Sequence, residues 1–329
     1  MAIQASAVEG RRELVSVVMV NLNCLQYVDA VLESLKIQTY RPIELLIFDN
    51  GSSDGSLERI RERAPDASVF EMGRNTGFSR PNNEGIRHAK GAYVLCLNFD
   101  VVLEKDFIEE MVAAIERSPE IGWAAGKMLK LVGRERRDEI DCLGHHMSKC
   151  RYATETDHSR PFSWEQYSVP QYVFGASACA ALYRRAMLED IALGGEYFDE
   201  DFFAYFEDVD LDWRAQQRNW KCLYTPKAVG YHARGGSQLI RNWRVAGCYL
   251  SNHLFLQIKN DHWPHLREDL RPISRKALSN LAGYLRKNPL AVAAALGRIV
   301  RHLPRMYRKR RIIASRRTAS LGYLRGLIR

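Results

Sequence analysis

Residues 43–56 read IELLIFDNGSSDGS, an apolar run that passes directly into a loop of small and helix-capping residues. The run predicts a strand over Ile43–Phe48 that is buried on both faces. Leu57 and Ile60 follow the loop at helical spacing, so a helix comes next. A strand that leads through a polar loop into a helix is the unit of an α/β fold with a parallel sheet.

The same unit recurs on both sides of this stretch. A continuous apolar run, VSVVMVNL, precedes it, and AYVLCL follows it. Repeated strand–helix units predict a mostly parallel central sheet flanked by helices. The predicted strands are Val15–Leu22, Ser68–Met72 and Ala92–Leu97, and the predicted helices are Leu25–Leu35, a segment ending at Ile86–Lys90 with Gly91 as its C′ residue, and Phe107–Ile115.

The chain has 329 residues, of which 46% are hydrophobic and 26% charged. These values are ordinary for a globular protein and exclude a disordered, collagenous or disulfide-stapled chain. No run approaches the roughly 18 apolar residues of a membrane-spanning helix, which argues against a synthase with its own membrane channel. The first residues lack the charged start and apolar core of a signal peptide, so a cytoplasmic location is expected.

Charge is distributed unevenly along the chain. The net charge is +9, yet residues 270–329 hold 16 Lys or Arg and no Asp or Glu, which leaves −7 for the first 269 residues. Apolar stripes through Leu278 and Leu281, and through Leu296 and Val300, predict amphipathic helices in this basic region. An anionic membrane surface is the expected partner. A solvated helical extension is the alternative, and nucleic acid is disfavoured because the region has few aromatic residues.

The seven cysteines are scattered, mostly within apolar runs, which indicates reduced, buried thiols. Cys142-x-x-His145 and His146-x-x-x-Cys150 have the spacing of metal ligands, so a structural zinc site is an alternative for this segment. Adjacent histidines rarely both face one ion, which weakens that alternative.

Polar residues gather where predicted strands end. The first cluster is Asp49–Ser56, the second is Asn98-Phe99-Asp100, and the third combines Glu207-Asp208 with the downstream His232. Ligands of parallel sheets bind beyond the carboxyl ends of the strands. Carboxylates there can hold a divalent cation that neutralises a diphosphate, and a further carboxylate can act as a general base. The clusters together predict a nucleotide-diphosphate site with acid–base chemistry.

Each cluster also has a purely structural interpretation. Asp49 and Asp54 could be turn and cap residues, and Asp100 could cap a helix over 101–106. The Glu207-Asp208 segment could be a solvated acidic face, and His232 a packing or surface histidine. The order and spacing of the clusters over roughly 200 residues favour the binding site.

Several segments carry a resemblance to a known family: VSVVMVNLN, IELLIFDNGSSDGS, GRNTGFSRPNNEGIRHAKGAYVLCLNFD, VFGASACAALYRRAM, GGEYFDEDFFAYFEDVDLDWR and YHARGGS. In their order the chain resembles the family 2 glycosyltransferases, specifically the rhamnosyltransferase-like branch. The resemblance implies a GT-A fold, with a Rossmann-like, mostly parallel sheet and a basic α-helical C-terminal extension. It divides the chain into an N-terminal tail (1–14), a catalytic domain with a nucleotide-binding half (15–125) and an acceptor half (126–245), and the helical extension (246–329).

The resemblance also implies roles for individual residues. Asp208 matches the general base, with Glu207 beside it. Asp100 and His232 match ligands of Mg²⁺ or Mn²⁺, and Asn98 stands where the metal motif has its first Asp, which leaves Asp100 as the principal carboxylate ligand. Gly235, Gly236 and Ser237 match a loop that closes over the donor. The residues matched to the donor site are Asn23, Asp49, Asn50, Asp54, Arg74, Asn75, Gly77, Asn83 and Asn98.

The implied reaction is glycosyl transfer with inversion, in which Asp208 deprotonates an acceptor hydroxyl and the cation neutralises the leaving diphosphate. The expected donor is dTDP-L-rhamnose and the expected acceptor is lipid-linked or a polysaccharide, met at the inner face of the plasma membrane by a peripheral protein. The alternatives are a UDP-galactose, UDP-N-acetylglucosamine or GDP-mannose donor, or a non-catalytic scaffold subunit docked by its basic tail. The sequence does not determine the oligomeric state.

Overall fold

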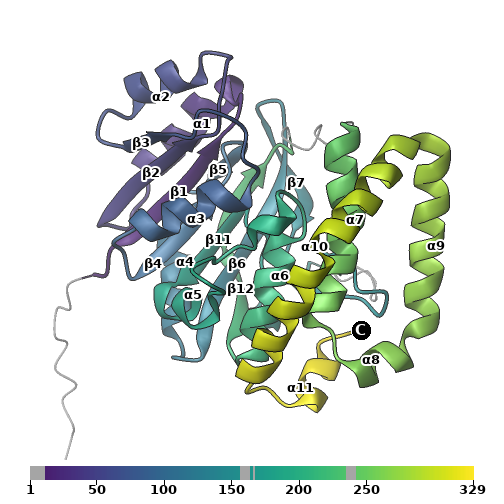
Figure 1. The fold of residues 1–329 in the computed structure, drawn as a ribbon. Helices are drawn as coiled ribbons and strands as arrows, with labels where there is room; N and C mark the ends of the chain where they lie inside the picture. Colours follow the sequence, from purple (N-terminus) through teal and green to yellow (C-terminus); the bar gives the residue numbers. More distant parts are fainter. Residues whose placement is uncertain (1–11, 156–163, 166, 235–241) are drawn as a thin grey trace, which may run out of the picture.

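The computed structural model describes residues 12–155, 164–165, 167–234 and 242–329. Within them, a ten-stranded sheet runs in the order β10-β12-β6-β11-β4-β1-β2-β3, with β5 paired to β12 and β7 paired to β6. Helices cover this sheet, and a layer of C-terminal helices lies beside it (Figure 1).

The first half of the sheet is parallel, as predicted. β1 (Val15–Asn21) lies between β2 (Ile43–Asp49) and β4 (Tyr93–Leu97), and β3 (Ser68–Glu71) extends the sheet beyond β2. The register places Asn21 opposite Asp49, so the polar ends of β1 and β2 lie at the same edge.

Helices cover both faces because successive strand residues point to opposite sides. On one side Val17 packs with α1 (Leu25–Lys36), α2 (Ser56–Arg63) and α4 (Phe107–Glu116). On the other side Val18 packs with α3 (Ser79–His88), α5 (Arg185–Ile191) and α6 (Glu207–Gln217). The prediction of a central sheet between layers of helices is confirmed.

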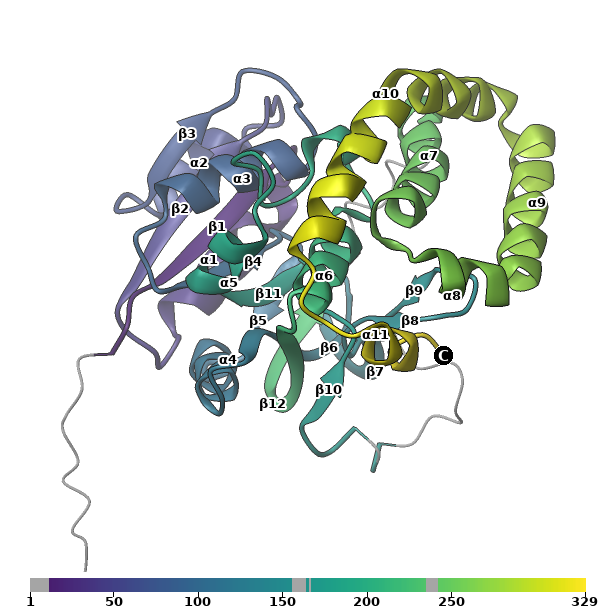
Figure 2. The ribbon, with the colours of Figure 1, turned by 60° about the horizontal axis from the view of Figure 1, so that its bottom comes forward.

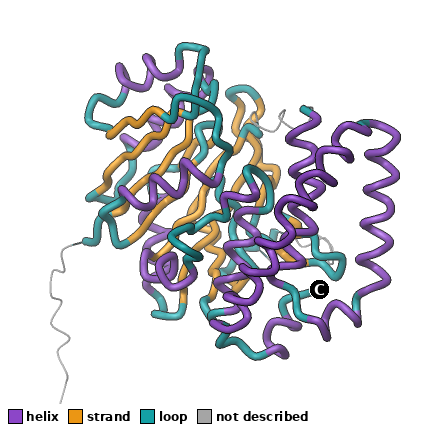
Figure 3. The backbone as a smooth tube through the Cα atoms, in the orientation of Figure 1, coloured by secondary structure: helices purple, strands orange, loops and turns teal. Residues whose placement is uncertain are grey.

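The second half of the sheet is mixed. β11 runs antiparallel between β4 and β6, whereas β12 is parallel to β6. Figure 3 shows these long strands crossing the middle of the molecule. The strands here are β5 (Val101–Leu103), β6 (Ile121–Val132), β7 (Glu135–Cys142), β8 (His146–Met147), β9 (Ala153–Thr154), β10 (Gln171–Val173), β11 (Ala180–Arg184) and β12 (Lys221–His232).

The C-terminal region is helical, as predicted. α10 packs along α7, while α9 stands away from the sheet and joins α10 at one end (Figure 2). A third core joins these helices to the body: Phe202 and Trp213 pack with Phe255 of α7 and Met306 of α10. The elements are α7 (Trp243–Asn260), α8 (Trp263–Glu268), α9 (Leu270–Lys287), α10 (Pro289–Arg316) and α11 (Leu321–Gly326).

One local prediction was wrong, and one alternative interpretation is excluded. α3 ends at His88 with Ala89 as its C-cap, so Gly91 is not a C′ residue; its N–H instead donates to Ser16 Oγ at 2.8 Å. The segment after Asp100 is the strand β5, not a helix, because it pairs with the end of β12. Asp100 is therefore not a helix cap.

Candidate active site

The loop after β2 is organised by buried polar side chains. Asp49 accepts from Asn21 Nδ2 at 2.7 Å and from the N–H groups of Gly51 and Ser52, both at 3.1 Å. Asn21, which the sequence interpretation missed, also donates to Ser56 Oγ at 2.8 Å. The strand-end Asp predicted to face the donor thus shapes the loop that borders the site.

Asn23 and Asp54 tie the same loop to the start of α1. Asn23, at a left-handed φ of 55°, accepts from the Ser53 N–H at 2.8 Å. Asp54 accepts from the Leu25 N–H at 2.9 Å and from the Ser56 N–H at 3.0 Å, so it serves the N-termini of both α1 and α2. The cap role considered for Asp54 is therefore present in the structure.

Asn50 fixes the neighbouring loop that carries Arg74, Asn75 and Gly77. Its Oδ1 accepts from the Thr76 N–H at 2.9 Å and its Nδ2 donates to the Gly77 carbonyl at 2.8 Å. Gly77 has a φ of 91°, and a Cβ there would lie 2.4 Å from the Phe203 carbonyl oxygen, so only glycine fits. Asn75 closes the turn by accepting from the Gly77 N–H at 2.9 Å, and Arg74 is exposed at the loop surface.

Asn83 is fully buried on α3 and joins it to the chain before the predicted base. It accepts from the N–H groups of Tyr197 and Phe198 at 3.1 and 2.8 Å, and it donates to the Phe198 carbonyl at 2.8 Å. Its side chain positions backbone around the site.

Asp100 and His232 lie together, as their predicted shared role requires. His232 Nε2 is 3.3 Å from Asp100 Oδ1, and His232 Nδ1 is 2.9 Å from Asp141 Oδ2. The Ala233 N–H donates to the Asp100 carbonyl at 2.9 Å, which joins the ends of the two segments. Burial lowers the pKa of His232, but Asp100 and Asp141 outweigh it and raise the pKa to about 9. Asp141 was not predicted; no short motif marks it.

A pocket of about 430 Å³ opens beside His232 and is lined in part by Lys130, Asp141, Glu155 and Arg234. Arg234 forms ion pairs with Asp141 and Glu155. The predicted lid residues Gly235, Gly236 and Ser237 lie outside the described residues.

The predicted base, Asp208, lies in the first turn of α6, and its side chain contacts the segment that leads into β11. Its Oδ1 accepts from the Val209 N–H at 2.8 Å, and its Oδ2 accepts from the Ala178 N–H at 3.3 Å. The carbonyl of the next residue, Cys179, accepts from the Asn98 N–H at 2.9 Å. The segment 178–179 therefore connects the Asn98–Asp100 turn with Asp208, and the two halves of the predicted site share one edge of the sheet.

Glu207 differs sharply from its neighbour. Its carboxyl group is buried, and burial together with Asp208 holds the pKa of Glu207 well above its usual range. The side chain of Asp208 is 18% exposed. Asp208 is therefore the member of the pair that solvent and a substrate can reach.

His145 lies behind Asp208. Its Nδ1 is 2.7 Å from Asp212 Oδ2, and its Nε2 is 3.8 Å from Asp208 Oδ2. The zinc alternative does not hold for the described residues, which contain no group of three His, Cys, Asp or Glu placed to bind a metal. Cys142 is buried in the core, and the Cys150 thiol lies 3.2 Å from Ser148 Oγ.

The backbone before Glu207 is strained, and a helix outside the sheet, α7, holds it in place. Phe203, Tyr205 and Phe206 have left-handed φ values of 66°, 71° and 69°. Asn252 of α7 places its Nδ2 2.8 to 2.9 Å from the carbonyls of Phe202, Ala204 and Tyr205. The sequence offered no sign of this contact, because Asn252 follows the loop by some 50 residues.

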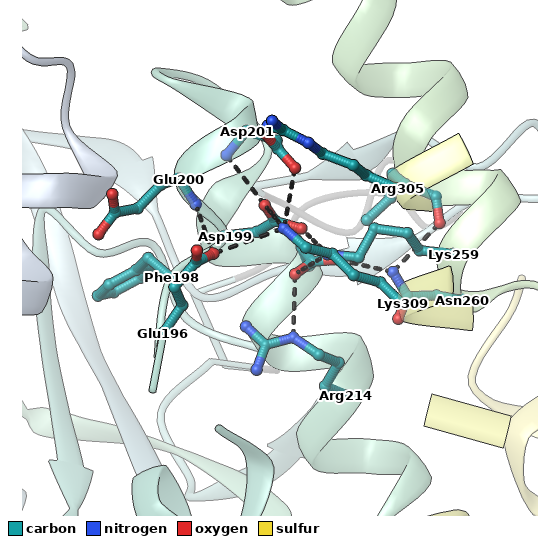
Figure 4. Close-up of polar contacts among 12 residues, drawn as sticks. Glu196, Phe198, Asp199, Glu200, Asp201, Arg214, Lys259, Asn260, Arg305 and Lys309 are labelled. Atoms are coloured by element: carbon teal, nitrogen blue, oxygen red, sulfur yellow. Dashed lines mark hydrogen bonds and ion pairs between the residues drawn. The ribbon is translucent and has the colours of Figure 1, made fainter. Parts of the chain in front are cut away.

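Ion pairs extend this bracing to α10. Figure 4 shows Asp199 and Asp201, from the segment around the short 3₁₀ helix η1 (Glu200–Phe202), facing Lys259 of α7 and Lys309 of α10. Lys309 Nζ is 3.0 Å from Asp201, and Lys259 Nζ is 2.8 Å from Asp210, two residues beyond Asp208. Part of the basic charge of the tail therefore forms ion pairs with acidic side chains of the same molecule.

Carboxylates lie at the ends of the strands of this sheet, and an acidic pair begins a helix over the same edge. This arrangement is that of a GT-A glycosyltransferase. The chain belongs to glycosyl transferase family 2, whose profile matches residues 16–192. It is therefore a glycosyltransferase.

Among its relatives is the N-acetylglucosaminyl-diphospho-decaprenol L-rhamnosyltransferase of Mycobacterium tuberculosis, 25% identical over 270 residues, which are 76% of this chain and 86% of that one. The poly-beta-1,6-N-acetyl-D-glucosamine synthase of Staphylococcus epidermidis is 25% identical over 66% of this chain, but the match spans only 49% of the synthase. A mannosyltransferase from Pyrobaculum calidifontis, solved with GDP-Man and Mn²⁺, shares the fold with a TM-score of 0.53 at 18% identity, over 96% of this chain and 79% of its own. No helix of the described residues is long and apolar enough to cross a bilayer.

Proposed function

We propose that this glycosyltransferase moves L-rhamnose from dTDP-L-rhamnose, with inversion, onto a lipid-linked or polysaccharide acceptor, and that Asp208 is its general base. One observation carries the proposal: Asp208 is fixed by two backbone N–H groups at the sheet edge that also presents Asn98 and Asp100. The mycobacterial relative, named as a rhamnosyltransferase acting on a diphospho-decaprenol acceptor, supports the choice of sugar and acceptor class.

Asp208 has the properties of a base for an acceptor hydroxyl. Its two backbone donors fix the direction of its side chain. Glu207 is buried, and its pKa is held well above its usual range by that burial and by Asp208, so Asp208 is the accessible carboxyl of the pair. The acceptor oxygen, as it loses its proton to Asp208, attacks the anomeric carbon from the face opposite the nucleotide, which inverts the configuration.

A divalent cation fits Asp100 and His232. Mg²⁺ and Mn²⁺ accept a carboxylate and an imidazole and complete their shells with waters and phosphate oxygens, so two protein ligands suffice. Asp141 holds His232 Nδ1 and leaves Nε2 facing Asp100, as a carboxylate commonly does for a metal-binding histidine, and Nε2 would lose its proton when the ion binds. When bound, the ion would neutralise charge on the leaving diphosphate.

The donor nucleotide is proposed to lie over the loops that follow β2 and β3. Asp49, Asn50 and Asn83 shape these loops from within. Asn23, Asp54, Arg74 and Asn75 lie nearer the surface, where the nucleotide is expected. Gly77 allows the loop to pass close to Phe203, and Asn98 borders the diphosphate end.

The membrane component of the proposal rests on α9. Ile273 is its one buried residue, and Leu278, Leu281 and Leu285 are 66%, 41% and 52% exposed. On a helical projection these leucines form one stripe with Leu270, and Arg271, Arg275 and Arg286 follow beside it. Leucines flanked by arginines suit an anionic lipid interface. We therefore propose that α9 holds the enzyme at the membrane that carries its acceptor.

A ligand panel tests the donor and the cation. The purified chain is melted with dTDP-L-rhamnose, UDP-galactose, UDP-N-acetylglucosamine and GDP-mannose, each with Mn²⁺ and with a chelator. We expect the largest rise in Tm with dTDP-L-rhamnose and Mn²⁺ together. Transfer of rhamnose to an N-acetylglucosaminyl-diphospho-prenol, with the anomeric configuration read by NMR, then tests the reaction. A larger rise with another donor would replace rhamnose, and retention of configuration would refute the role of Asp208.

A further inference from the structure

We propose that His145, anchored by Asp212, is a positioning residue that fixes the direction of the Asp208 side chain. The inference rests on the proposed role of Asp208 and deepens it. His145 lies 63 residues before Asp208 in the chain, and its side chain lies between Asp208 and Asp212 of α6.

The backbone places His145 firmly. Its N–H donates to the Gly175 carbonyl at 2.7 Å, and its own carbonyl accepts from the Phe174 N–H at 3.0 Å. This bridge carries the ring beneath the first turn of α6. The ring is buried, so it does not itself meet a substrate.

Asp212 determines which ring nitrogen faces Asp208. Asp212 is buried. It accepts hydrogen bonds from the Ala176 N–H at 3.3 Å and from the His145 Nδ1–H at 2.7 Å. A Cβ at residue 175 would lie 1.8 Å from Asp212 Oδ2, so glycine is required for Asp212 to sit there. With Nδ1 committed to Asp212, Nε2 is directed toward Asp208 Oδ2, 3.8 Å away.

The charges around this cluster agree with the geometry. Burial lowers the pKa of His145, but Asp208 and Asp212 raise it to about 9. Burial raises the pKa of Asp212 to about 6, although the hydrogen bond from His145 opposes it. Of the other titratable groups that act on these residues, Glu155 adds negative charge at longer range, and burial raises the pKa values of Glu207 and Tyr183. At neutral pH the ring of His145 is therefore an imidazolium that lies beside Asp208 and Asp212.

An imidazolium 3.8 Å from Asp208 Oδ2 attracts that oxygen toward the ring and so fixes the direction of the side chain. Without it, Asp208 would be held only by its two backbone N–H donors and would be less well placed for the acceptor hydroxyl.

The test compares His145→Gln and Asp212→Asn with His146→Gln, the adjacent histidine on β8, as the matched control. The kcat and the donor KM of rhamnosyl transfer are measured, together with the Tm and the donor-induced rise in Tm. We expect the kcat of His145→Gln to fall about tenfold to a hundredfold, as for a misplaced catalytic group, while the donor KM stays unchanged. Asp212→Asn should lower kcat in the same way, while His146→Gln leaves it unchanged and the donor-induced rise persists in all three.

A kcat that stays at the wild-type value in both variants, whatever their Tm, overturns the inference and leaves His145 a packing residue. Absence of transfer by the wild-type chain, or full transfer by Asp208→Asn, overturns the proposed function instead. The wild-type and Asp208→Asn assays are run first, so the two failures are distinguishable.

Discussion

The guanidinium of Arg298 on α10 donates to Asn252 Oδ1 on α7 at 3.0 Å, and Asn252 in turn holds the carbonyls of the loop before Glu207. Arg298 also donates to the Asp201 carbonyl at 2.7 Å. Two C-terminal helices thereby fix three residues with left-handed φ immediately before the predicted base.

Asn252→Ala should loosen that loop. We expect a loss of about 1–3 kcal/mol in the free energy of unfolding, because buried carbonyls lose their donor. We also expect kcat to fall more than donor affinity, since Asp208 would be less well placed. Denaturant unfolding and steady-state kinetics measure both. Arg301→Ala, an exposed site on the same helix as Arg298, is the control and should change neither. An unchanged kcat in Asn252→Ala would separate the loop from catalysis.

Asp208→Asn should reduce kcat by about 10²–10⁴-fold, the usual contribution of a general base. The Tm should stay within a few degrees of the wild type, and the donor should still raise it, because Asn keeps the shape and a side-chain oxygen acceptor. Asp138→Asn, an exposed site on β7, is the control. If Asp208→Asn retained wild-type turnover, another residue would have to be the base.

Asp100→Ala and His232→Gln should each remove most of the additional rise in Tm that Mn²⁺ gives with the donor. Asp141→Asn should weaken this rise less, because Asp141 orients His232 and does not face the ion. Isothermal titration of Mn²⁺ into the donor complex measures the affinity. Equal metal affinity in Asp100→Ala and the wild type would show that the ion binds elsewhere.

His253 predicts how stability depends on pH. It is stacked on Tyr152 with ring centroids 3.9 Å apart, and its Nε2–H donates to the Arg151 carbonyl at 3.1 Å. Burial lowers the pKa of His253 from 6.5 to about 4. The unfolded chain therefore takes up a proton that the folded chain refuses, so this contribution is complete above pH 6.5 and is lost as the pH falls toward 4.

The size of this effect is at most about 3 kcal/mol. Urea unfolding of the wild type and His253→Gln from pH 7.5 to 4.5 isolates it, because the variant cannot titrate at this position. The stability difference between the two should shrink or reverse as the pH falls. A difference that stays constant would mean that His253 is protonated in the folded protein.

Replacing Leu278, Leu281 and Leu285 with Ser should release the enzyme from vesicles that contain anionic lipid, without lowering the Tm, since all three side chains are exposed. Sedimentation with anionic and with neutral vesicles measures binding. Val132→Ser, an exposed apolar site on β6, is the control. Truncation of the tail is a poor test, because it would also remove Arg298 and Lys309 from their contacts with the body. Undiminished sedimentation of the triple variant would exclude α9 as the membrane contact.

The parallel half of the fold was predictable because its signals are local. The apolar run of β2 and the capping loop after it are adjacent in sequence, and the strand that precedes them has the same form. The antiparallel strand β11 was not identified, because pairing between β4 and β6 is a long-range choice that no short motif encodes. The end of α3 was placed two residues late because Gly91 resembles a helix stop, whereas it lies against Ser16.

In the candidate site, too, residues in local motifs were predictable, whereas residues that act through long-range contacts were not. Asp100, His232 and Asp208 were found from motifs, and the structure brings Asp100 and His232 into contact. Asp141 and His145 were not assigned to the site, because each acts on a residue more than 60 positions away. Asn83 was predicted to line the donor site, and in the structure its Oδ1 accepts hydrogen bonds from the backbone N–H groups of Tyr197 and Phe198.

The left-handed run at Phe203, Tyr205 and Phe206 limits how this enzyme can be re-engineered. A chimera that exchanges everything after residue 242 to borrow another acceptor preference would discard the amide of Asn252 and the cations of Lys259 and Lys309 together. Graft boundaries should instead isolate α9, whose single buried side chain, Ile273, makes it the most separable piece of the C-terminal half.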